Sequence, residues 1–332
     1  MSPKIILVTG GAGYIGSVCT EQLISAGYKV VVIDNLSTGH RQAVHSRAKF
    51  VQGNIGNKSL MGLIFKKYKF NCVIHFAART LVSEASTRPN LYFSNNVTNG
   101  LHLLDVMRES NCRKIIFSSS AAVYGEPKHT PISEHHPTRP LNAYGESKLM
   151  FEKVLKHYKS AFGLNYIVFR YFNPAGASKN YGEFHDPETH LVPLVLQVAA
   201  GNRTKFNIYG NDYDTPDGTC IRDFPHVEDI ANAHILALKK IDQFSGSVYN
   251  LGSQIGFSVR QVISAATKIT GAKIPVEIVS RRPGDPSRLV ATSSRAKQEL
   301  GWRPQYPDLK DIIASAWAWF QLHPRGYNTS HG

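Results

Sequence analysis

Short apolar runs alternate with amphipathic stretches through the first half of the chain. The runs with the length of buried strands are residues 5–9, 29–33, 50–51, 72–78, 114–118 and 166–170. Helical spacing of apolar positions appears at residues 14–26, 57–69, 90–110 and 142–161. Strands that alternate with helices predict βαβ units. We therefore expect an α/β fold with a Rossmann-type, doubly wound parallel sheet.

The alternation breaks after residue 178, where prolines and glycines mark a loop-rich region. A helix at 229–238 and a strand at 248–251 follow, and both are expected to return to the main sheet. Further helices are expected at 258–270, 294–300 and 308–320, with a strand at 274–279. We expect a first domain of residues 1–178, with 225–255 returning to it. Residues 179–224 and 256–332 are then a smaller, sequence-discontinuous α/β domain that binds substrate.

Glycines follow the first strand and open the first helix. Gly10, Gly13 and Gly16 have the spacing G-x-x-G-x-x-G. Such glycines permit a tight turn, a close approach of the backbone to a pyrophosphate, and close packing of helix on strand. The helix N-terminus adds free N–H groups and a positive dipole end. The context of strand, turn and helix therefore predicts a dinucleotide site.

Asp34 ends the second strand. A carboxylate there can accept hydrogen bonds from an adenosine ribose, and it would repel a 2′-phosphate. The position favours NAD over NADP, although a turn residue at a strand end is the alternative interpretation.

Tyr144 and Lys148 are four residues apart, which places them one turn apart on one helix face. An ammonium beside a phenol lowers the pKa of the phenol, so the pair predicts a general base near neutral pH. Ser118 and Ser120 follow an earlier strand, and their hydroxyls can hold a substrate hydroxyl or relay its proton. The alternatives are a surface Tyr with a solvated Lys, and serines that only end a strand. His75 lies inside an apolar run and is expected to be a core histidine.

Composition narrows the functional classes. The 332 residues carry a net charge of +14, but the basic residues are scattered, which disfavours nucleic-acid binding. No apolar run reaches the length of a membrane span, and the N-terminus is expected to enter the first strand directly. The four cysteines form no C-x-x-C pair, which indicates reduced thiols, a cytoplasmic location, and neither a disulfide framework nor a zinc site. We expect no bound metal.

Taken together, the motifs resemble the extended short-chain dehydrogenase/reductase superfamily. Within it they are similar to the UDP-glucose 4-epimerase (UDP-galactose 4-epimerase) family. The matching blocks are residues 10–17, 34–40, 75–78, 117–126, 142–148, 169–177, 209–227, 250–259, 281–286 and 300–302. The resemblance implies an isomerase of galactose metabolism that interconverts UDP-glucose and UDP-galactose through a 4-keto intermediate, with transient hydride transfer to bound NAD. It also implies that the first domain binds NAD and the second the UDP-sugar, and that helices 90–110 and 142–161 form a homodimer contact.

The resemblance implies a role for each matching residue. The catalytic residues are Tyr144, Lys148 and Ser120. The cofactor-binding residues are Gly10, Gly13, Tyr14, Ile15, Gly16, Asp34, Asn35, Asn54, Ile55, Phe76, Ala77, Ala78, Asn95, Ser118, Tyr144, Lys148 and Tyr171. The substrate-binding residues are Ser120, Tyr144, Asn173, His190, Leu191, Tyr209, Arg222, Arg282 and Asp285.

Alternatives of several classes stay open. Epimerases of UDP-N-acetylglucosamine, UDP-glucuronate or UDP-pentose share the mechanism, and Leu289 stands where residue size is thought to gate N-acetylated sugars. A nucleotide-sugar dehydratase needs an Asp–Glu pair where this chain has Ala121 and Ala122. A dinucleotide-sensing regulator would not need the three catalytic side chains together. Asn54 and His190 depart from the family pattern, in which Asp and Asn are familiar at these positions.

Overall fold

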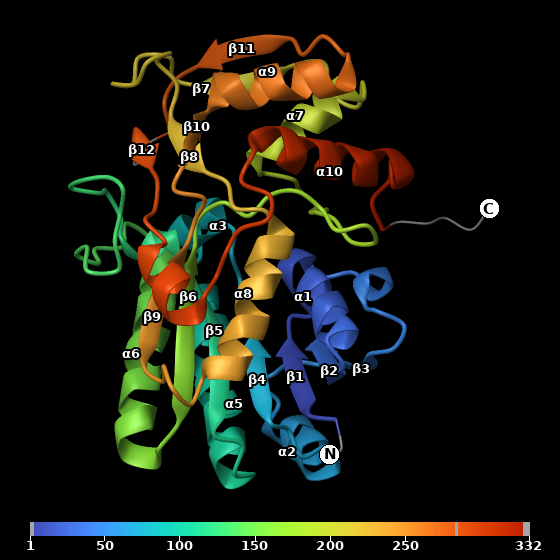
Figure 1. Cartoon of the computed structure of the whole chain (residues 1–332), viewed down its shortest axis with the longest axis vertical. Helices are drawn as coiled ribbons and strands as arrows, with labels where there is room; N and C mark the ends of the chain where they lie inside the picture. Colours follow the sequence, from blue (N-terminus) through green and yellow to red (C-terminus); the bar gives the residue numbers. More distant parts are fainter. Residues whose placement is uncertain (1–2, 283–284, 328–332) are drawn as a thin grey trace.

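A seven-stranded sheet forms the centre of the structure, a computed structural model that describes residues 3–282 and 285–327 (Figure 1). Every neighbouring pair of its strands is parallel. Its spatial order is β3 (Lys49–Gln52), β2 (Lys29–Asp34), β1 (Ile5–Thr9), β4 (Cys72–His75), β5 (Lys114–Ser120), β6 (Asn165–Tyr171) and β9 (Ser247–Leu251). The chain reverses its direction of winding between β1 and β4, and ligands of such sheets bind beyond the carboxyl ends at this switch point. The expected Rossmann-type α/β fold is confirmed.

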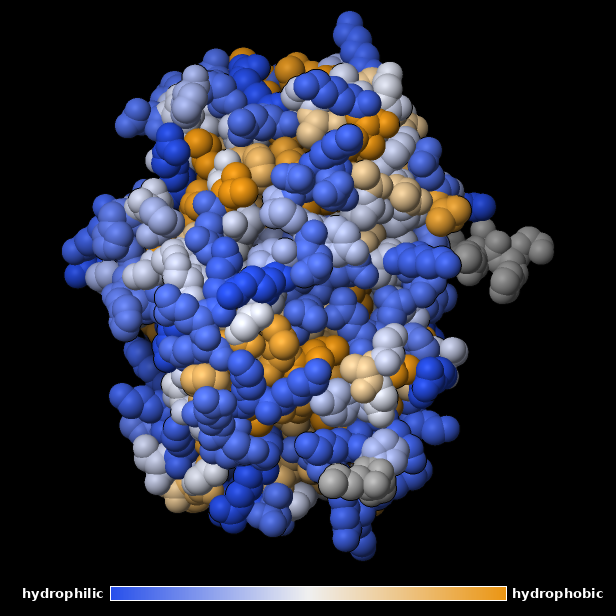
Figure 2. Space-filling model, viewed as in Figure 1, coloured by the Kyte–Doolittle hydropathy of each residue, from blue (hydrophilic) through white to orange (hydrophobic). Residues whose placement is uncertain are grey.

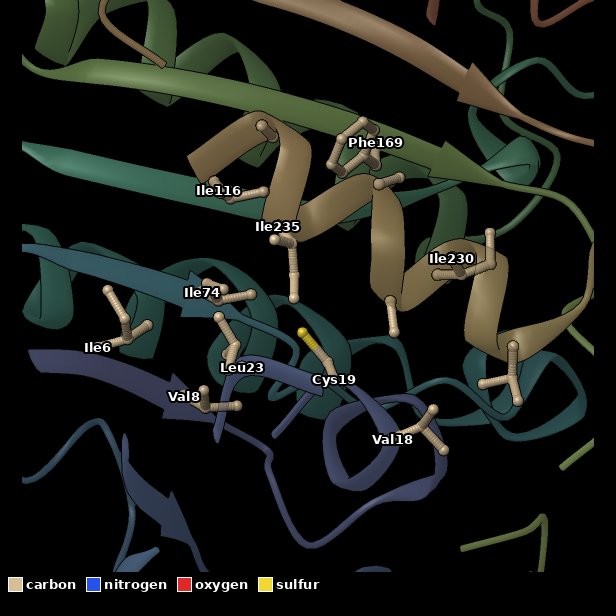
Figure 3. Packing of buried hydrophobic residues seen from close by; sticks show 14 of the residues in the cluster. Ile6, Val8, Val18, Cys19, Leu23, Ile74, Ile116, Phe169, Ile230 and Ile235 are labelled. Carbon is tan, nitrogen blue, oxygen red and sulfur yellow. The ribbon is translucent and has the colours of Figure 1, made fainter. Parts of the chain in front are cut away.

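Helices cover both faces of the sheet. α1 (Tyr14–Ser25) and α8 (Val227–Lys240) lie on one face, and α2 (Lys58–Lys67), α5 (Asn99–Glu109) and α6 (Ala143–Phe162) on the other. Alternate strand residues enter the two cores, because successive side chains of a strand point to opposite faces. Ile6 and Val8 of β1 pack with α1 and α8, as Figure 3 shows, whereas Leu7 packs on the opposite side. Such two-sided burial explains why the strands of the sequence are continuous apolar runs.

The long helix expected at 90–110 is helical throughout but not uniform. α3 (Val82–Thr87) and α4 (Pro89–Tyr92) lead into a π-helical segment, Phe93–Thr98, and α5 continues from it. A π-helical segment is often found at functional sites. The strand expected at 72–78 already ends at His75, whose exposure of 1% confirms a core histidine. Its Nδ1 lies 2.7 Å from the Thr9 hydroxyl.

A smaller body of short elements lies above the carboxyl edge of the main sheet (Figure 1). Its helices are α7 (Leu191–Ala199), α9 (Val259–Thr270) and α10 (Leu309–Leu322), which share a hydrophobic core. One small sheet has the order β10 (Gly256–Ser258), β8 (Ile221–Asp223), β12 (Arg288–Leu289), and the other pairs β11 (Val276–Val279) with β7 (Phe206–Tyr209). The region expected to be loop-rich thus contains α7. Pro193 is compatible with this helix because it lies in the first turn, where its missing N–H is not needed.

Three short helical segments complete the described chain: η1 (Arg41–Ala43), η3 (Ala121–Val123) and η4 (Ala296–Leu300). Trp302 follows η4 and is fully buried in the core between the main sheet and α8. Its indole N–H donates to the Asp229 carbonyl at 2.9 Å, which fixes this late segment on α8. The outer surface is mostly hydrophilic on the face shown in Figure 2, with hydrophobic residues in small groups.

Candidate active site

The glycine turn between β1 and α1 contains glycines of two kinds. Gly10 has φ +70°, and a Cβ there would lie 2.6 Å from the Ala77 nitrogen. A Cβ on Gly16 would lie 2.3 Å from the Gly10 carbonyl oxygen. The fold itself therefore requires glycine at these two positions, because no side chain fits.

Gly13 differs from its neighbours. A Cβ there would meet only the Gly10 oxygen, at an ordinary 3.4 Å, and its φ of −86° suits any residue. Gly13 is the N-cap of α1, which has no side-chain cap and no acidic residue in its first turn. The missing side chain thus leaves space outside the protein, next to N–H groups and a positive helix end. This arrangement fits the pyrophosphate of a dinucleotide.

Asp34 at the end of β2 is held by the backbone. Its Oδ2 accepts from the Ala12 N–H at 3.0 Å and its Oδ1 from the Leu36 N–H at 2.8 Å. Burial raises the pKa of this carboxyl, and the two hydrogen bonds oppose the increase. Each oxygen retains a further lone pair, so the carboxylate can still accept from ribose hydroxyls. Asn35 beside it accepts from the Ser37 N–H at 3.0 Å.

Asn54 and Ile55 follow β3, the strand that pairs with β2. The Asn54 side-chain oxygen accepts from the Gly56 N–H at 2.8 Å and from Asn99 at 3.2 Å. Ile55 is buried in the core. Asn54 therefore fixes the conformation of this loop.

The loop after β4 is fixed by a residue that sequence reasoning missed. Phe76 and Ala77 donate their N–H groups to the Thr9 carbonyl at 3.0 and 3.1 Å. Asn96, not its neighbour Asn95, is the buried anchor: its side-chain oxygen accepts from the Arg79 N–H at 2.8 Å. Asn95 donates to the Asn96 oxygen at 3.0 Å.

The Asn96 amide also reaches α6. It donates to the Ser147 hydroxyl at 2.9 Å. The only sequence signal for this role was a pair of asparagines inside a predicted helix. Asn96 therefore ties the loop after β4 to the helix that carries Tyr144 and Lys148.

The carboxyl end of β5 brings the predicted catalytic residues together. Lys148 is 3% exposed, and its Nζ donates to the Ser118 carbonyl at 2.7 Å. The same Nζ lies 5.9 Å from the centroid of the Tyr144 ring. The Ser120 hydroxyl lies close enough to the Tyr144 phenol to oppose the rise in its pKa, and it accepts from the Ala122 N–H at 3.2 Å.

The pKa of Tyr144 differs from the sequence expectation. Burial raises it, and the nearby Ser120 hydroxyl opposes the increase without reversing it. Burial also lowers the pKa of Lys148 to about 7, against the attraction of Glu152. The expected lowering of the phenol pKa by Lys148 is therefore wrong for the protein alone, because desolvation acts on both side chains.

A buried polar network lies beneath these residues. Glu152 pairs with Arg170 through two contacts of 3.0 and 2.6 Å, and it accepts from the Ser119 hydroxyl at 2.5 Å. Arg170 donates to the Tyr124 hydroxyl at 2.9 Å, which donates to Asn250 at 2.6 Å. Sequence reasoning missed this network, whose one local signal was Glu152 at four residues from Lys148. It joins β5, β6, β9 and α6 under the site.

Tyr171 ends β6 beside this site. Its hydroxyl lies 2.6 Å from the Nε2 atom of His234 on α8, and both side chains are buried. Burial raises the pKa of Tyr171 well above its usual range.

The predicted substrate-binding residues form pairs in the smaller body. Arg222 of β8 forms an ion pair with Asp285. The Arg282 guanidinium carbon lies 3.8 Å from the centroid of the Tyr209 ring. The Asn173 amide donates to the Asp223 carbonyl at 3.2 Å, next to Arg222.

Two further residues of this set begin α7. Leu191 is its first residue, and His190 is its N-cap. The His190 ring faces Glu188, with its Nδ1 2.9 Å from Oε1.

Leu289 connects the two groups of residues. It pairs with Arg222 in the small sheet. Its side chain packs on the cluster that contains Ala121 and Phe172, the neighbours of Ser120 and Asn173. Leu289 therefore lies between the predicted catalytic and substrate-binding residues.

Comparison with known proteins assigns the chain to a family. Residues 6–252 match the NAD dependent epimerase/dehydratase family. The chain belongs to this family. The match includes the glycine turn, Asp34 and the helix of Tyr144. NAD, the cofactor of the family, is thus the dinucleotide for which the glycine turn is suited.

Similar proteins match the chain over nearly its whole length. The UDP-glucose 4-epimerase of Streptococcus mutans is 51% identical over 328 residues, which cover 97% of this chain and 98% of that protein. A crystal structure of a UDP-glucose 4-epimerase is 49% identical, with a TM-score of 0.96, and covers 98% of this chain and 100% of its own. That of Bifidobacterium longum, in complex with NAD+ and UDP, is 39% identical, with a TM-score of 0.92 and coverage of 97% and 100%. Among the described residues, no helix has both the length and the apolar character to cross a membrane.

Proposed function

We propose that this protein is an NAD-dependent isomerase that interconverts UDP-glucose and UDP-galactose. The observation that carries the proposal is the group formed by Ser120, Tyr144 and Lys148 at the carboxyl end of β5. The chain that carries this group belongs to a family, and the members most similar to it in the comparison above are UDP-glucose 4-epimerases. The group supplies a base for a sugar hydroxyl, and Ala121 and Ala122 offer no acid–base pair for dehydration.

The residues around the switch point suit NAD. Gly13 and the first turn of α1 would hold the pyrophosphate, and Asp34 would accept from the adenosine ribose. Lys148 and Tyr171 would border the nicotinamide end. Bound NAD+ supplies a hydride acceptor that later becomes the donor, so the reaction has no net redox change.

The protein's own side chains would handle the proton. Tyr144 takes the proton of the sugar 4-hydroxyl and returns it once C4 has been inverted through a 4-keto sugar. Ser120 holds the same oxygen and relays the proton. A cation near the phenol is needed, since burial alone raises the pKa of Tyr144. Lys148 supplies this charge when it is protonated, in addition to the positive charge of an oxidised nicotinamide.

The smaller body would anchor UDP. Arg222 and Arg282 present guanidinium groups that suit a diphosphate, and the Tyr209 ring offers an apolar face. Asn173 and the start of α7, with His190 and Leu191, complete the proposed contacts. Anchoring at UDP leaves the sugar free to turn, which is required for hydride return to its opposite face.

A product assay tests the proposal. The purified protein is incubated with UDP-galactose without added NAD, and the nucleotide sugars are separated by chromatography. We expect UDP-glucose to form, because the cofactor stays bound through the cycle. If none forms even with NAD supplied, the 4-epimerase proposal is wrong.

The range of sugars is a second question for this site. Leu289 packs beside Phe172 and Ala121, close to where the sugar would turn. Parallel assays with UDP-N-acetylgalactosamine, UDP-glucuronate and UDP-pentoses show whether Leu289 closes or opens the pocket. If a Leu289→Ala variant converts UDP-N-acetylgalactosamine and the parent protein does not, Leu289 is the residue that excludes N-acetylated sugars.

We also propose a homodimer through α5 and α6. The Tyr158 hydroxyl of α6 donates to Asp105 of α5 at 2.8 Å, and Met150 and Phe162 of α6 are 41% and 42% exposed. Light scattering of the purified protein tests this, since a monomer at micromolar concentration would contradict it. The four free cysteines support a cytoplasmic location, which cell fractionation checks.

We also propose that the chain has two domains. The NAD-binding domain comprises residues 1–178 and 225–255, and the UDP-sugar domain comprises residues 179–224 and 256–332. This division is supported by the separate core around α7, α9 and α10. Limited proteolysis tests it, since protected fragments should end near residues 178 and 224.

A further inference from the structure

Two glutamates and two histidines converge in the segment that precedes α7. Glu183, His185, Glu188 and His190 each present one potential ligand atom, and these atoms all lie within 4.8 Å of one another. We call these four residues the Glu–His cluster. None of the proposed catalytic steps uses these four side chains, and only His190 is also one of the proposed UDP contacts.

The arrangement of the cluster alternates nitrogen and oxygen. The His190 Nδ1 lies 3.0 Å from Glu183 Oε1 and 2.9 Å from Glu188 Oε1. The His185 Nδ1 lies 3.6 Å from Glu183 Oε1 and 3.5 Å from Glu188 Oε2. Zinc bonds to nitrogen and oxygen are about 2.0–2.2 Å long, so ligand atoms of a regular tetrahedron are about 3.3 Å apart. The four contacts lie on both sides of this separation, with Glu188 contributing Oε1 to one and Oε2 to another, and one ligand atom from each residue falls within 4.8 Å of the other three.

Hydrogen bonding alone does not account for the His185 ring. Its Nδ1 is shielded from solvent and forms no hydrogen bond of standard length and angle, although the ring lies close enough to Glu188 to lower the pKa of that carboxyl, which burial alone would raise. It nevertheless faces both carboxylates at a distance slightly too long for a hydrogen bond. If the other ring nitrogen carries the proton, this Nδ1 atom and the two carboxylates can coordinate a common cation.

The charges of the cluster lead to the same conclusion. The side chains of Glu183 and Glu188 are 8% and 3% exposed. Two buried carboxylates so close together need compensation. A divalent cation with two neutral imidazoles would make the group neutral. Without a cation, protons must supply this compensation.

We propose that the Glu–His cluster is a binding site for a divalent transition-metal cation, with Zn²⁺ as the favoured occupant. Two imidazole nitrogens and two carboxylate oxygens suit zinc, whereas Mg²⁺ and Ca²⁺ prefer oxygen ligands alone. The site would be structural, because the protein itself offers four ligand atoms, the number that a closed zinc site uses. The expectation of no zinc site came from the spacing of the cysteines, and this site uses none of them.

The backbone around the cluster is already prepared for a cation. Glu188 Oε1 accepts from the N–H groups of Thr189 and His190, both at 2.8 Å, which fixes the orientation of its carboxylate. The Phe184 carbonyl lies 3.2 Å from the Nε2 atom of His40, in the loop after β2. A cation here would therefore fasten the start of α7 against the nucleotide side of the main sheet. It would fix the backbone of Leu191 without touching a reacting atom.

Zinc binding by the full-length protein with its bound NAD tests the proposal. The protein is dialysed against a chelator and titrated with ZnCl₂ by calorimetry at neutral pH. We expect one zinc per chain, with no competition from excess Mg²⁺. Cobalt replacing zinc should give the visible absorption of a tetrahedral site, without the near-ultraviolet charge-transfer band of a thiolate ligand. A thiolate band, or no binding at all, would overturn the proposal, and the latter result would leave the cluster held by a proton.

Two variants locate the site. His185→Gln and Glu188→Gln each remove one ligand, and we expect zinc affinity to fall at least about ten-fold in each. His157→Gln is the matched control, because His157 is exposed on α6 and should leave affinity unchanged. Zinc should also raise the melting temperature of the parent protein and the control only. Equal affinity in all four proteins would place the zinc elsewhere and overturn the assignment.

Folding of the variants is checked by circular dichroism and by their NAD content. If both variants misfold, the cobalt spectrum and stoichiometry of the parent protein still decide the question. One cobalt in a thiolate-free tetrahedral spectrum supports the cluster, because the described chain offers no other group of this kind.

Discussion

Lys148 at the edge of the main sheet is 3% exposed, whereas the side chains of Arg222 and Asp285 in the smaller body are 11% and 27% exposed. Lys148 donates to a backbone carbonyl above a buried network, whereas Arg222 and Asp285 form an ion pair that solvent can reach. A partly exposed pair can exchange its partner for a diphosphate at little cost, while a buried group cannot move. On the proposed assignment of residues, a fixed site for chemistry is thus separate from an adaptable site for substrate capture.

The largest expected effect comes from Tyr144→Phe. Removing the hydroxyl removes the proposed base, so turnover should fall by up to about 10⁴-fold. Retained NAD, measured after denaturation of the purified protein, should stay at the parent level. Tyr158→Phe on the same helix is the control, since its hydroxyl bonds only to Asp105 on α5. Parent activity in Tyr144→Phe would remove this residue from the mechanism.

Glu152→Gln is expected to destabilise the main-sheet side. It leaves the Arg170 charge buried with a poor partner, which costs about 3–5 kcal/mol in the free energy of unfolding. Asp285→Asn breaks the partly exposed pair with Arg222 and should cost about 1 kcal/mol or less. Urea denaturation of both variants measures the contrast. Equal losses would show that the two sites are equally rigid, and the comparison would fail.

The same two variants should affect substrate binding in the opposite order, with the larger change in KM for Asp285→Asn. Asp285→Asn should change the KM for UDP-galactose, because Arg222 loses the group that orients it. Glu152→Gln should leave the KM unchanged under conditions where it stays folded.

The same contrast explains how far the sequence predicts the fold. The apolar run at 5–9 and the helical spacing from Tyr14 predicted β1 and α1 almost to the residue, since both are buried and regular. β8 and β12 have three and two residues, which is too short for any periodicity to show. Their existence depends on pairing between distant segments, and the parallel pairing of Leu289 with Arg222 is one example.

The candidate site divides in a similar way. The spacing of Tyr144 and Lys148, and the glycine turn, are local and visible in the sequence. The Asn96 contact with Ser147 and the Glu152 contact with Arg170 span 51 and 18 residues, so no local pattern signals them. The rise in the pKa of Tyr144 has a related cause, since it depends on burial, which is a property of the fold and not of the local sequence.

His226 lies where the two parts of the protein meet. Its Nε2 lies 2.9 Å from the Ser315 hydroxyl of α10, and its Nδ1 accepts from the Glu228 N–H of α8. The Tyr306 ring packs on it, and Glu228 and Asp229 lie in the first turn of α8 beside it. Burial lowers the pKa of His226 to about 4.

Acid should therefore loosen this joint. Between pH 6.5 and about 4 the unfolded chain binds a proton at His226 and the folded chain does not, so stability falls as the pH falls. The full effect is about 3 kcal/mol. His226→Asn can still cap α8, and it should flatten the decrease in the free energy of unfolding between pH 6.5 and 4. Parallel curves for parent and variant would contradict the assignment, because His75 and His234 titrate in both proteins.

Gly13→Ala should have the smallest effect on stability and binding. It distinguishes a glycine that the fold requires from one that a ligand requires. A methyl group at Gly13 meets only one atom, at 3.4 Å, so the free energy of unfolding should change by less than about 1 kcal/mol. The same methyl would occupy the space proposed for the pyrophosphate, and NAD affinity should fall about ten-fold, or about 1.4 kcal/mol. Gly16→Ala is the matched opposite, because its Cβ would lie 2.3 Å from the Gly10 oxygen and must destabilise the turn. Isothermal titration with NAD and urea denaturation measure both quantities. Parent affinity in a folded Gly13→Ala protein would mean that the pyrophosphate does not approach this residue.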